Sequence, residues 1–210
     1  MPTKLFHELN DDKKQTIISV GISEFGKHGY NDGSTNRIVK NSGISKGSLF
    51  KYFESKEELY FYLLECVTGE FASSLGKLRE SLPGDLFERV IKYSELEFAW
   101  YIQNPEKYNL ILKAFSKNDT DIYRKTQARY NDESQNIYDD LLADVNTVQF
   151  KWSKQKISNV LRWFLQGFNE EFVSKMEAQH GTNAKIDTVR REYVNSLTDY
   201  MEILKQGFLH

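Results

Sequence analysis

The chain has 210 residues, of which 40% are hydrophobic and 14% aromatic, and its formal net charge is -2. This composition is typical of a globular protein with a sizeable core and excludes an intrinsically disordered chain. The only cysteine, Cys66, excludes a disulfide framework and favours a reducing, cytoplasmic location. No apolar run approaches the roughly 20 residues needed to cross a bilayer, and the first residues lack the pattern of a secretory signal.

The N-terminal part is predicted to consist of short helices joined by tight turns, because nine of the twelve glycines lie at or before Gly84. A first helix over 11–28 carries an apolar stripe at i, i+4 spacing and ends before Gly29. A short helix over 35–41 follows Ser34 as its N-cap, and a turn over 42–44 leads into a helix from Ser45 to about residue 53. Ser55 then caps a longer helix that ends near residue 75 or 76.

The remaining chain is predicted to form long helices over 85–103, 105–115, 120–144, 153–179 and 185–208. No alternating β-branched run and no hairpin turn between apolar runs indicates a strand. We therefore expect an all-α fold with two domains. Residues 1–54 would be a helix-turn-helix DNA-binding domain, with a connecting helix from about residue 55, and residues 55–210 a helical effector-binding and dimerisation domain.

Basic residues gather in one stretch of this slightly acidic chain. Between residues 34 and 56 there are five basic side chains, Arg37, Lys40, Lys46, Lys51 and Lys56, and one acidic side chain. A local basic patch attracts DNA phosphates, whereas the alternative is an ordinary solvated helix face.

Two short helices joined by a turn with a central glycine indicate a helix-turn-helix motif, whose second helix enters the DNA major groove. Ser45 caps that helix and can donate to a phosphate, Lys46 lies at its tip, and Gly47 lets the helix approach DNA closely. Leu49 and Phe53 are expected to point inward. Lys51, Tyr52 and Lys56 are expected to reach phosphates.

The run TNRIVKNSGISKGSLFKYFESKEEL over 35–59 resembles the DNA-binding domain of tetracycline-repressor-like (TetR) transcriptional regulators. The preceding Ile17, Gly21, Phe25 and Gly29 resemble the first helix of that family, so the resemblance covers about residues 11 to 65. The chain departs from the family pattern at Val39 and Ser42, where alanine is usual, at Ser48 in place of threonine, and at Phe50 in place of tyrosine. Phe50 cannot make a hydroxyl contact with a phosphate, but it can pack or touch a thymine methyl.

Taken together, the motif and the resemblance predict the DNA-contacting residues Ser34, Thr35, Arg37, Ser45, Lys46, Gly47, Ser48, Phe50, Lys51, Tyr52 and Lys56. If Arg37, Lys46, Lys51 and Lys56 each neutralise one phosphate, a dimer makes about eight such contacts, and log K falls with log salt at a slope near -7.

The resemblance also implies a homodimer on a palindromic operator and a small-molecule effector of unknown identity. For the effector pocket we expect aromatic residues from the middle of the chain, although plain core packing is the more common role for each: Phe98, Tyr101, Tyr108, Phe115, Tyr123 and Trp163. For the dimer interface we expect the apolar stripes of the last two helices, with packing against the monomer core as the alternative for each residue: Phe164, Gly167, Phe168, Phe172, Tyr193, Leu197, Tyr200 and Leu204.

These residues predict a transcriptional repressor that a ligand releases from its operator. The alternative is a chromosome-organising or division-control factor on the same fold, whose body docks proteins. An enzyme is not indicated, because the sequence has no phosphate loop, nucleophile elbow or paired carboxylates on one helix face. The four histidines are scattered, and we expect no metal and no cofactor.

Overall fold

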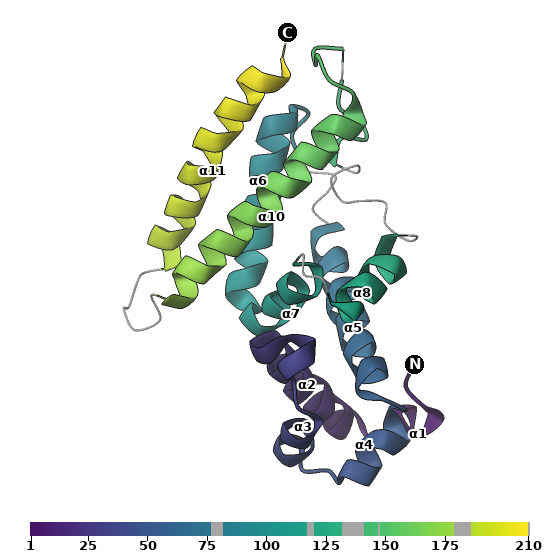
Figure 1. The fold of residues 1–210 in the computed structure, drawn as a ribbon. Helices are drawn as coiled ribbons and strands as arrows, with labels where there is room; N and C mark the ends of the chain where they lie inside the picture. The colour runs from purple at the N-terminus through teal and green to yellow at the C-terminus, as the bar shows by residue number, and fades with distance from the viewer. Residues whose placement is uncertain (77–81, 117–119, 132–140, 147, 179–185, 210) are drawn as a thin grey trace. The chain divides into compact units, whose positions relative to one another are not determined.

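The structure is a computed structural model that describes residues 1–76, 82–116, 120–131, 141–146, 148–178 and 186–209. Within these ranges the regular secondary structure is helical, apart from one isolated antiparallel bridge between Phe150 and Leu209 (Figure 1). The all-α prediction is confirmed. Two compact units form, one from residues 1–74 and 103–127 and the other from 75–102 and 128–210.

The first unit contains α1 (Lys4–His7), α2 (Asp11–Asp32), α3 (Thr35–Ser42), α4 (Lys46–Tyr52) and α7 (Pro105–Phe115), with most of α5 (Lys56–Gly76) and of α8 (Asp121–Asn131). The second contains α6 (Leu86–Gln103), α10 (Lys154–Ala178) and α11 (Ile186–Phe208).

The predicted helix boundaries agree with the structure to within a few residues. α2 extends to Asp32, but its helical conformation breaks at Gly29, where φ is 68°, in the region that favours glycine. Of the helix expected over 120–144, α8 covers Asp121–Asn131, and residues 132–140 lie outside the described residues. The sequence reasoning missed α1.

A compact apolar core holds the first unit together. Ile17, Phe25, Ile38 and Leu49, which come from α2, α3 and α4, are at most 1% exposed. A Cβ atom on Gly21 would lie 2.5 Å from the Leu63 Cδ1 atom, so this glycine lets α5 approach α2 closely. Burial of these side chains fixes the two short helices, which are too short to be stable alone.

Three helices that we assigned to the second domain, α5, α7 and α8, lie wholly or mostly in the first unit. α7 lies against α2, and a Cβ atom on Gly26 would be 2.5 Å from the backbone oxygen of Glu106. α5 contributes Leu59 and Leu63, both 0% exposed, to the core described above. The unit that carries the helix-turn-helix is therefore larger than residues 1–54.

Within the described part of the chain, no helix has both the length and the apolar character that crossing a bilayer requires.

Candidate nucleic-acid interface

Local hydrogen bonds define a helix-turn-helix formed by α3 and α4. The Ser34 hydroxyl accepts from the backbone N–H of Arg37 at the start of α3. Gly43 ends α3 with φ 66°, a left-handed conformation, and the Ile44 N–H donates to the Val39 carbonyl. The Ser45 hydroxyl accepts from the Ser48 N–H at 3.0 Å and so caps α4.

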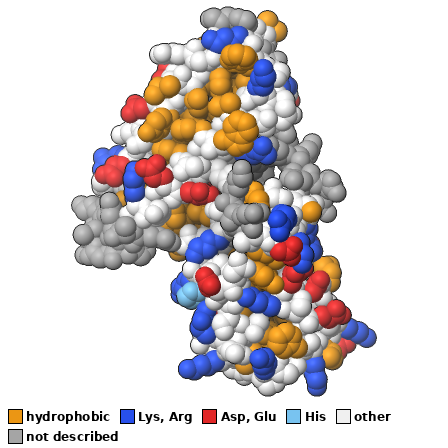
Figure 2. All heavy atoms as spheres, viewed as in Figure 1, with side chains coloured by type: hydrophobic (Ala, Val, Ile, Leu, Met, Phe, Trp, Pro, Cys, Tyr) orange, Lys and Arg blue, Asp and Glu red, His pale blue; other side chains and the backbone are white. Residues whose placement is uncertain are grey.

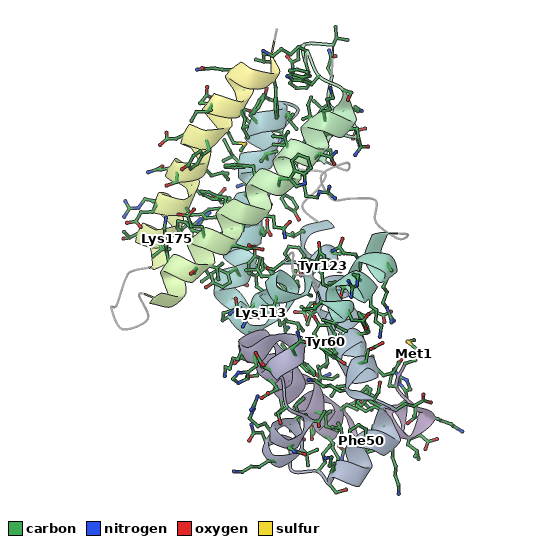
Figure 3. All side chains as sticks on the ribbon, in the orientation of Figure 1. Met1, Phe50, Tyr60, Lys113, Tyr123 and Lys175 are labelled. Carbon is green, nitrogen blue, oxygen red and sulfur yellow. The ribbon has the colours of Figure 1, made fainter. Side chains whose placement is uncertain are left out.

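The second of these helices, α4, is anchored on one side and open on the other. Leu49 and Phe53 are each 1% exposed, which confirms that they point inward. Lys46, Lys51 and Phe50 are exposed, and Phe50, 39% exposed, is labelled on this helix in Figure 3. An aromatic ring on the open face of a recognition helix is placed to touch thymine methyl groups.

Gly47 lies on the open face of α4 and has no packing role inside the protein. A Cβ atom at this position would meet only the Ser45 Oγ, at 3.9 Å. Its φ angle is negative, so its backbone conformation does not require glycine either. A glycine inside a helix lowers stability by about 1 kcal/mol relative to alanine, so its use here indicates close approach of an external partner.

Arg37 is held by an internal network that centres on Glu24 of α2. The Arg37 Nε donates to the Glu24 Oε1 at 2.9 Å, and its Nη2 donates to the Asp32 carbonyl at 2.8 Å. Glu24 is 7% exposed and also accepts from the Ser34 N–H at 2.7 Å. The network therefore ties α2 to the start of α3.

The charge state of Glu24 follows from the same contacts. Burial alone raises the pKa of this carboxyl, but the hydrogen bonds from Arg37 and Ser34, with the positive charge of Arg37, outweigh burial. The pKa of Glu24 is therefore below its ordinary value, and the side chain is ionised at neutral pH.

Lys56 is also held within the unit. Its Nζ donates to the Asn31 carbonyl at 3.2 Å and lies 4.6 Å from the centre of the Tyr30 ring. Burial lowers the pKa of Lys56. The ammonium groups of Lys40, Lys46 and Lys51 make no such contact with the described residues, and all three side chains are exposed.

The structure brings most of the predicted DNA contacts onto α3, α4 and the start of α5. Thr35, Ser48 and Tyr52 are half-buried, and the Ser48 hydroxyl lies 2.8 Å from that of Ser45. Sequence reasoning missed Glu24, although an acid inside the apolar face of the first helix, ten residues before Ser34, was a signal for a buried partner.

The residues predicted for an effector pocket are divided between the two units. Tyr108, Phe115 and Tyr123 lie in the first unit, and Phe98, Tyr101 and Trp163 lie in the second. Phe98 stacks on Tyr193 at 4.5 Å within a closely packed core, whereas Trp163 is 63% exposed. That these six residues share one pocket stays a prediction.

A cavity of about 230 Å³ lies in the first unit, beside the C-terminal end of α2. Tyr123 lines it, and the other five residues predicted for the pocket do not. Its walls come from the end of α2, from α5 and from the α7–α8 region, and include His28, Tyr30, Tyr60 and Lys113, of which Tyr60, Lys113 and Tyr123 are labelled in Figure 3.

The second unit exposes apolar side chains on α10 and α11, which Figure 2 shows as an orange area on the upper part of the molecule. Phe164, Phe168 and Phe172 are half-buried and Tyr200 is 48% exposed. Phe164 and Tyr200 join the two helices, with ring centres 5.4 Å apart.

The other residues predicted for the dimer interface differ in exposure. Gly167 is exposed and Leu204 is half-buried. Tyr193 and Leu197, at 2% and 0% exposed, pack inside the unit, and the Tyr193 hydroxyl donates to the Asn169 side chain.

In the described part of the chain, no group of three or more His, Cys, Asp or Glu residues is arranged to hold a metal ion.

Comparisons with known proteins agree with this geometry. Residues 17–63 match the model for bacterial regulatory proteins of the tetR family, and this range spans most of α2, all of α3 and α4 and the start of α5. Residues 17–63 therefore resemble the DNA-binding region of the TetR family.

The chain is 26% identical to the HTH-type transcriptional regulator QacR of Staphylococcus aureus over 197 residues, which cover 94% of this chain and 96% of QacR. The uncharacterised HTH-type regulator YerO of Bacillus subtilis is 32% identical over 82 residues, which are 39% of this chain and 28% of YerO. The matched region spans only 28% to 40% of the length of the first curated relatives. A TetR-family regulator from Chloroflexus aurantiacus shares the fold with a TM-score of 0.67 at 18% identity, covering 100% of this chain and 99% of that one.

Proposed function

We propose that this protein is a homodimeric transcriptional repressor of the TetR family, which binds a palindromic operator and leaves it when a small molecule binds. The observation that carries the proposal is the open face of α4. Lys46, Lys51 and Phe50 project from a helix whose Gly47 has no internal role. Exposed cations and an aromatic ring, next to a glycine that leaves room for a partner to come close, suit a helix that enters the DNA major groove.

Dimerisation is proposed through the exposed apolar surface of α10 and α11. Trp163, Tyr200 and Ile203 are 63%, 48% and 65% exposed, and they lie close in sequence to Phe164, Phe168 and Leu204. Large exposed apolar patches mark interaction sites. A second copy of the chain is the proposed occupant, because a two-fold dimer presents its two recognition helices about 34 Å apart, in successive major grooves.

For an effector to release the protein from DNA, the effector site must be connected to the helix-turn-helix. The contact between α7 and α2 supports such a connection. The Ser23 hydroxyl donates to the Glu106 Oε1 at 2.8 Å, and Lys27 pairs with the same carboxylate. The Lys113 Nζ also donates to the Lys27 carbonyl. A ligand that moves α7 would therefore move α2, which positions α3 through Glu24.

By linkage, the effector and the operator must weaken each other's binding by the same factor. Tyr123, at the cavity beside α7 and α8, is the proposed effector contact among the predicted pocket residues.

The test is to mix the purified protein with sheared genomic DNA of its source and to sequence the fragments it retains at moderate salt. We expect a few sites that share one inverted repeat. Lys46→Ala is the matched control, because this side chain is exposed and makes no contact with the described residues, so its loss should remove a DNA contact without affecting the fold.

Many dispersed sites would favour the chromosome-organising alternative over a repressor. Equal retention by the wild type and by Lys46→Ala would remove Lys46 from the interface. An absence of any enriched sequence would contradict the proposal of sequence-specific DNA binding.

A further inference from the structure

The N-terminal segment packs against the end of α4, and this contact was not expected from the sequence. The Thr3 N–H donates to the Tyr52 carbonyl at 2.9 Å, and the Thr3 hydroxyl donates to the Lys51 carbonyl at 2.7 Å. Thr3 is separated from these residues by 48 and 49 positions in the chain, so the contact is tertiary and not a local turn.

These two bonds satisfy groups that a short helix leaves without partners. The last four carbonyls of an α-helix have no intrahelical donor. In α4 the Leu49 carbonyl accepts from the Phe53 N–H, and Thr3 supplies donors for Lys51 and Tyr52. A helix of seven residues is far below the roughly 12 residues at which isolated helices become marginally stable, so its ends determine how well it is ordered.

Phe6 of α1 completes the contact with an apolar anchor. Its side chain is 0% exposed, and its ring centre lies 4.8 Å from Phe53, 5.5 Å from Tyr62 and 6.1 Å from Tyr52. Phe53 and Tyr62 also contact each other, at 5.5 Å. The segment from Thr3 to His7 therefore covers the inner side of α4 at the end opposite the Ser45 cap.

We infer that Thr3 and Phe6 are positioning residues for DNA recognition, which hold the C-terminal half of α4 in its groove-binding orientation without touching DNA. The inference rests on the proposed function. Lys51 is the cation at this end of α4, and the Thr3 hydroxyl bonds to the backbone of Lys51 itself. Freedom of that backbone would blur the register of Phe50 on the bases, whereas the long, flexible Lys51 side chain could still reach a phosphate.

The decisive variant is Thr3→Val in the full chain, since valine keeps the shape and the backbone N–H of threonine and removes only the hydroxyl. Thr3→Ser restores the hydroxyl and serves as the rescue variant. Lys46→Ala, at the other end of α4, tests the proposed function independently. Binding to the retained genomic site and to an unrelated duplex of equal length is measured by fluorescence anisotropy, at a temperature where every variant is folded by circular dichroism.

Thr3→Val is expected to weaken operator binding by about threefold to tenfold, the effect of one neutral hydrogen bond. Its binding to the unrelated duplex and its salt slope should equal those of the wild type, because no phosphate contact is lost. Thr3→Ser should bind the operator as the wild type does.

If Thr3→Val binds the operator as tightly as the wild type while Lys46→Ala binds it more weakly, the positioning role is overturned and the proposed function stays intact. An equal loss on both duplexes would also overturn it, because the role would then be in general folding. Unchanged operator binding by Lys46→Ala would instead count against the proposed function.

Discussion

Five basic side chains lie between residues 34 and 56, and their contacts divide them into two groups. Arg37 and Lys56 bond to groups of their own unit and hold the turn between α2 and α3. Lys40, Lys46 and Lys51 keep their ammonium groups exposed. Sequence spacing predicts that these basic residues form a cluster. It cannot tell which of them bond within the protein, because the partners Glu24 and Asn31 lie in α2, far from the cluster in sequence.

Gly47→Ala separates a role in DNA binding from a role in the fold. Alanine is the better helix former, and the added Cβ meets no close atom of the protein, so we expect stability to rise by up to about 1 kcal/mol. DNA binding should weaken, because the added methyl group would clash with the DNA where α4 enters the major groove. Thermal unfolding and operator titration of the same sample check both effects. Operator affinity that stays unchanged would mean that α4 does not approach DNA at Gly47.

Glu24→Gln tests the network that holds Arg37. At neutral pH we expect a loss of stability of about 1 kcal/mol, because a hydrogen bond to a charged group is replaced by a neutral one. The folded pKa of Glu24 is lowered, so its contribution is complete above the ordinary value of 4.5 and is lost as pH falls through the lower folded value. The wild type should therefore lose its advantage over the variant below pH 4.5. Thermal unfolding from pH 3 to 7 measures this, and a constant difference at every pH would contradict it.

At the scale of elements, local signals predicted the helices well, and long-range contacts were not predictable. Ser34 and Ser45 cap their helices as expected, and Gly43 lies in the expected turn, because caps and turns depend on residues within one turn. The four-residue helix α1 carries no periodic pattern, and its stability comes from Phe6 packing on residues some 50 positions away. The same limit applies to α7, whose apolar stripe shows that it is buried but not that α2 is its partner.

Gly26→Ala tests the packing of α7 on α2. The added Cβ would lie 2.5 Å from the Glu106 backbone oxygen, and a backbone atom in a helix cannot move away cheaply. We expect a loss of stability of about 1–3 kcal/mol, typical of overpacking, and weaker operator binding because α2 positions α3. Gly69→Ala is the control, since a Cβ there meets nothing within 4 Å, and it should be neutral or slightly stabilising. Chemical denaturation of both variants measures the difference, and equal stability would mean that the two helices separate without cost.

At the scale of the whole molecule, the free cations determine the response to salt. If the three exposed lysines Lys40, Lys46 and Lys51 each neutralise one phosphate, the proposed dimer makes six such contacts, and we expect a slope of log K against log salt near -5. The value near -7 predicted from the sequence counted Arg37 and Lys56, whose charges are engaged within the protein. The doubling of contacts depends on dimerisation, so a test of the proposed interface on α10 and α11 is also a test of the proposed function.

Gly167→Arg is the sharpest test of that interface. Gly167 is exposed on α10, and a Cβ there meets nothing within 4 Å, so the monomer accommodates a long side chain without strain. If a second copy covers this face, the buried guanidinium has no partner and association weakens by at least about tenfold, because an unpaired buried charge costs several kcal/mol. Operator affinity then falls with it, since each protomer binds only a half-site. Gly69→Arg adds the same charge at another open glycine and should leave both properties unchanged. Sedimentation equilibrium and operator titration compare the two variants, and a Gly167→Arg protein that dimerises like the wild type would place the interface elsewhere on the chain.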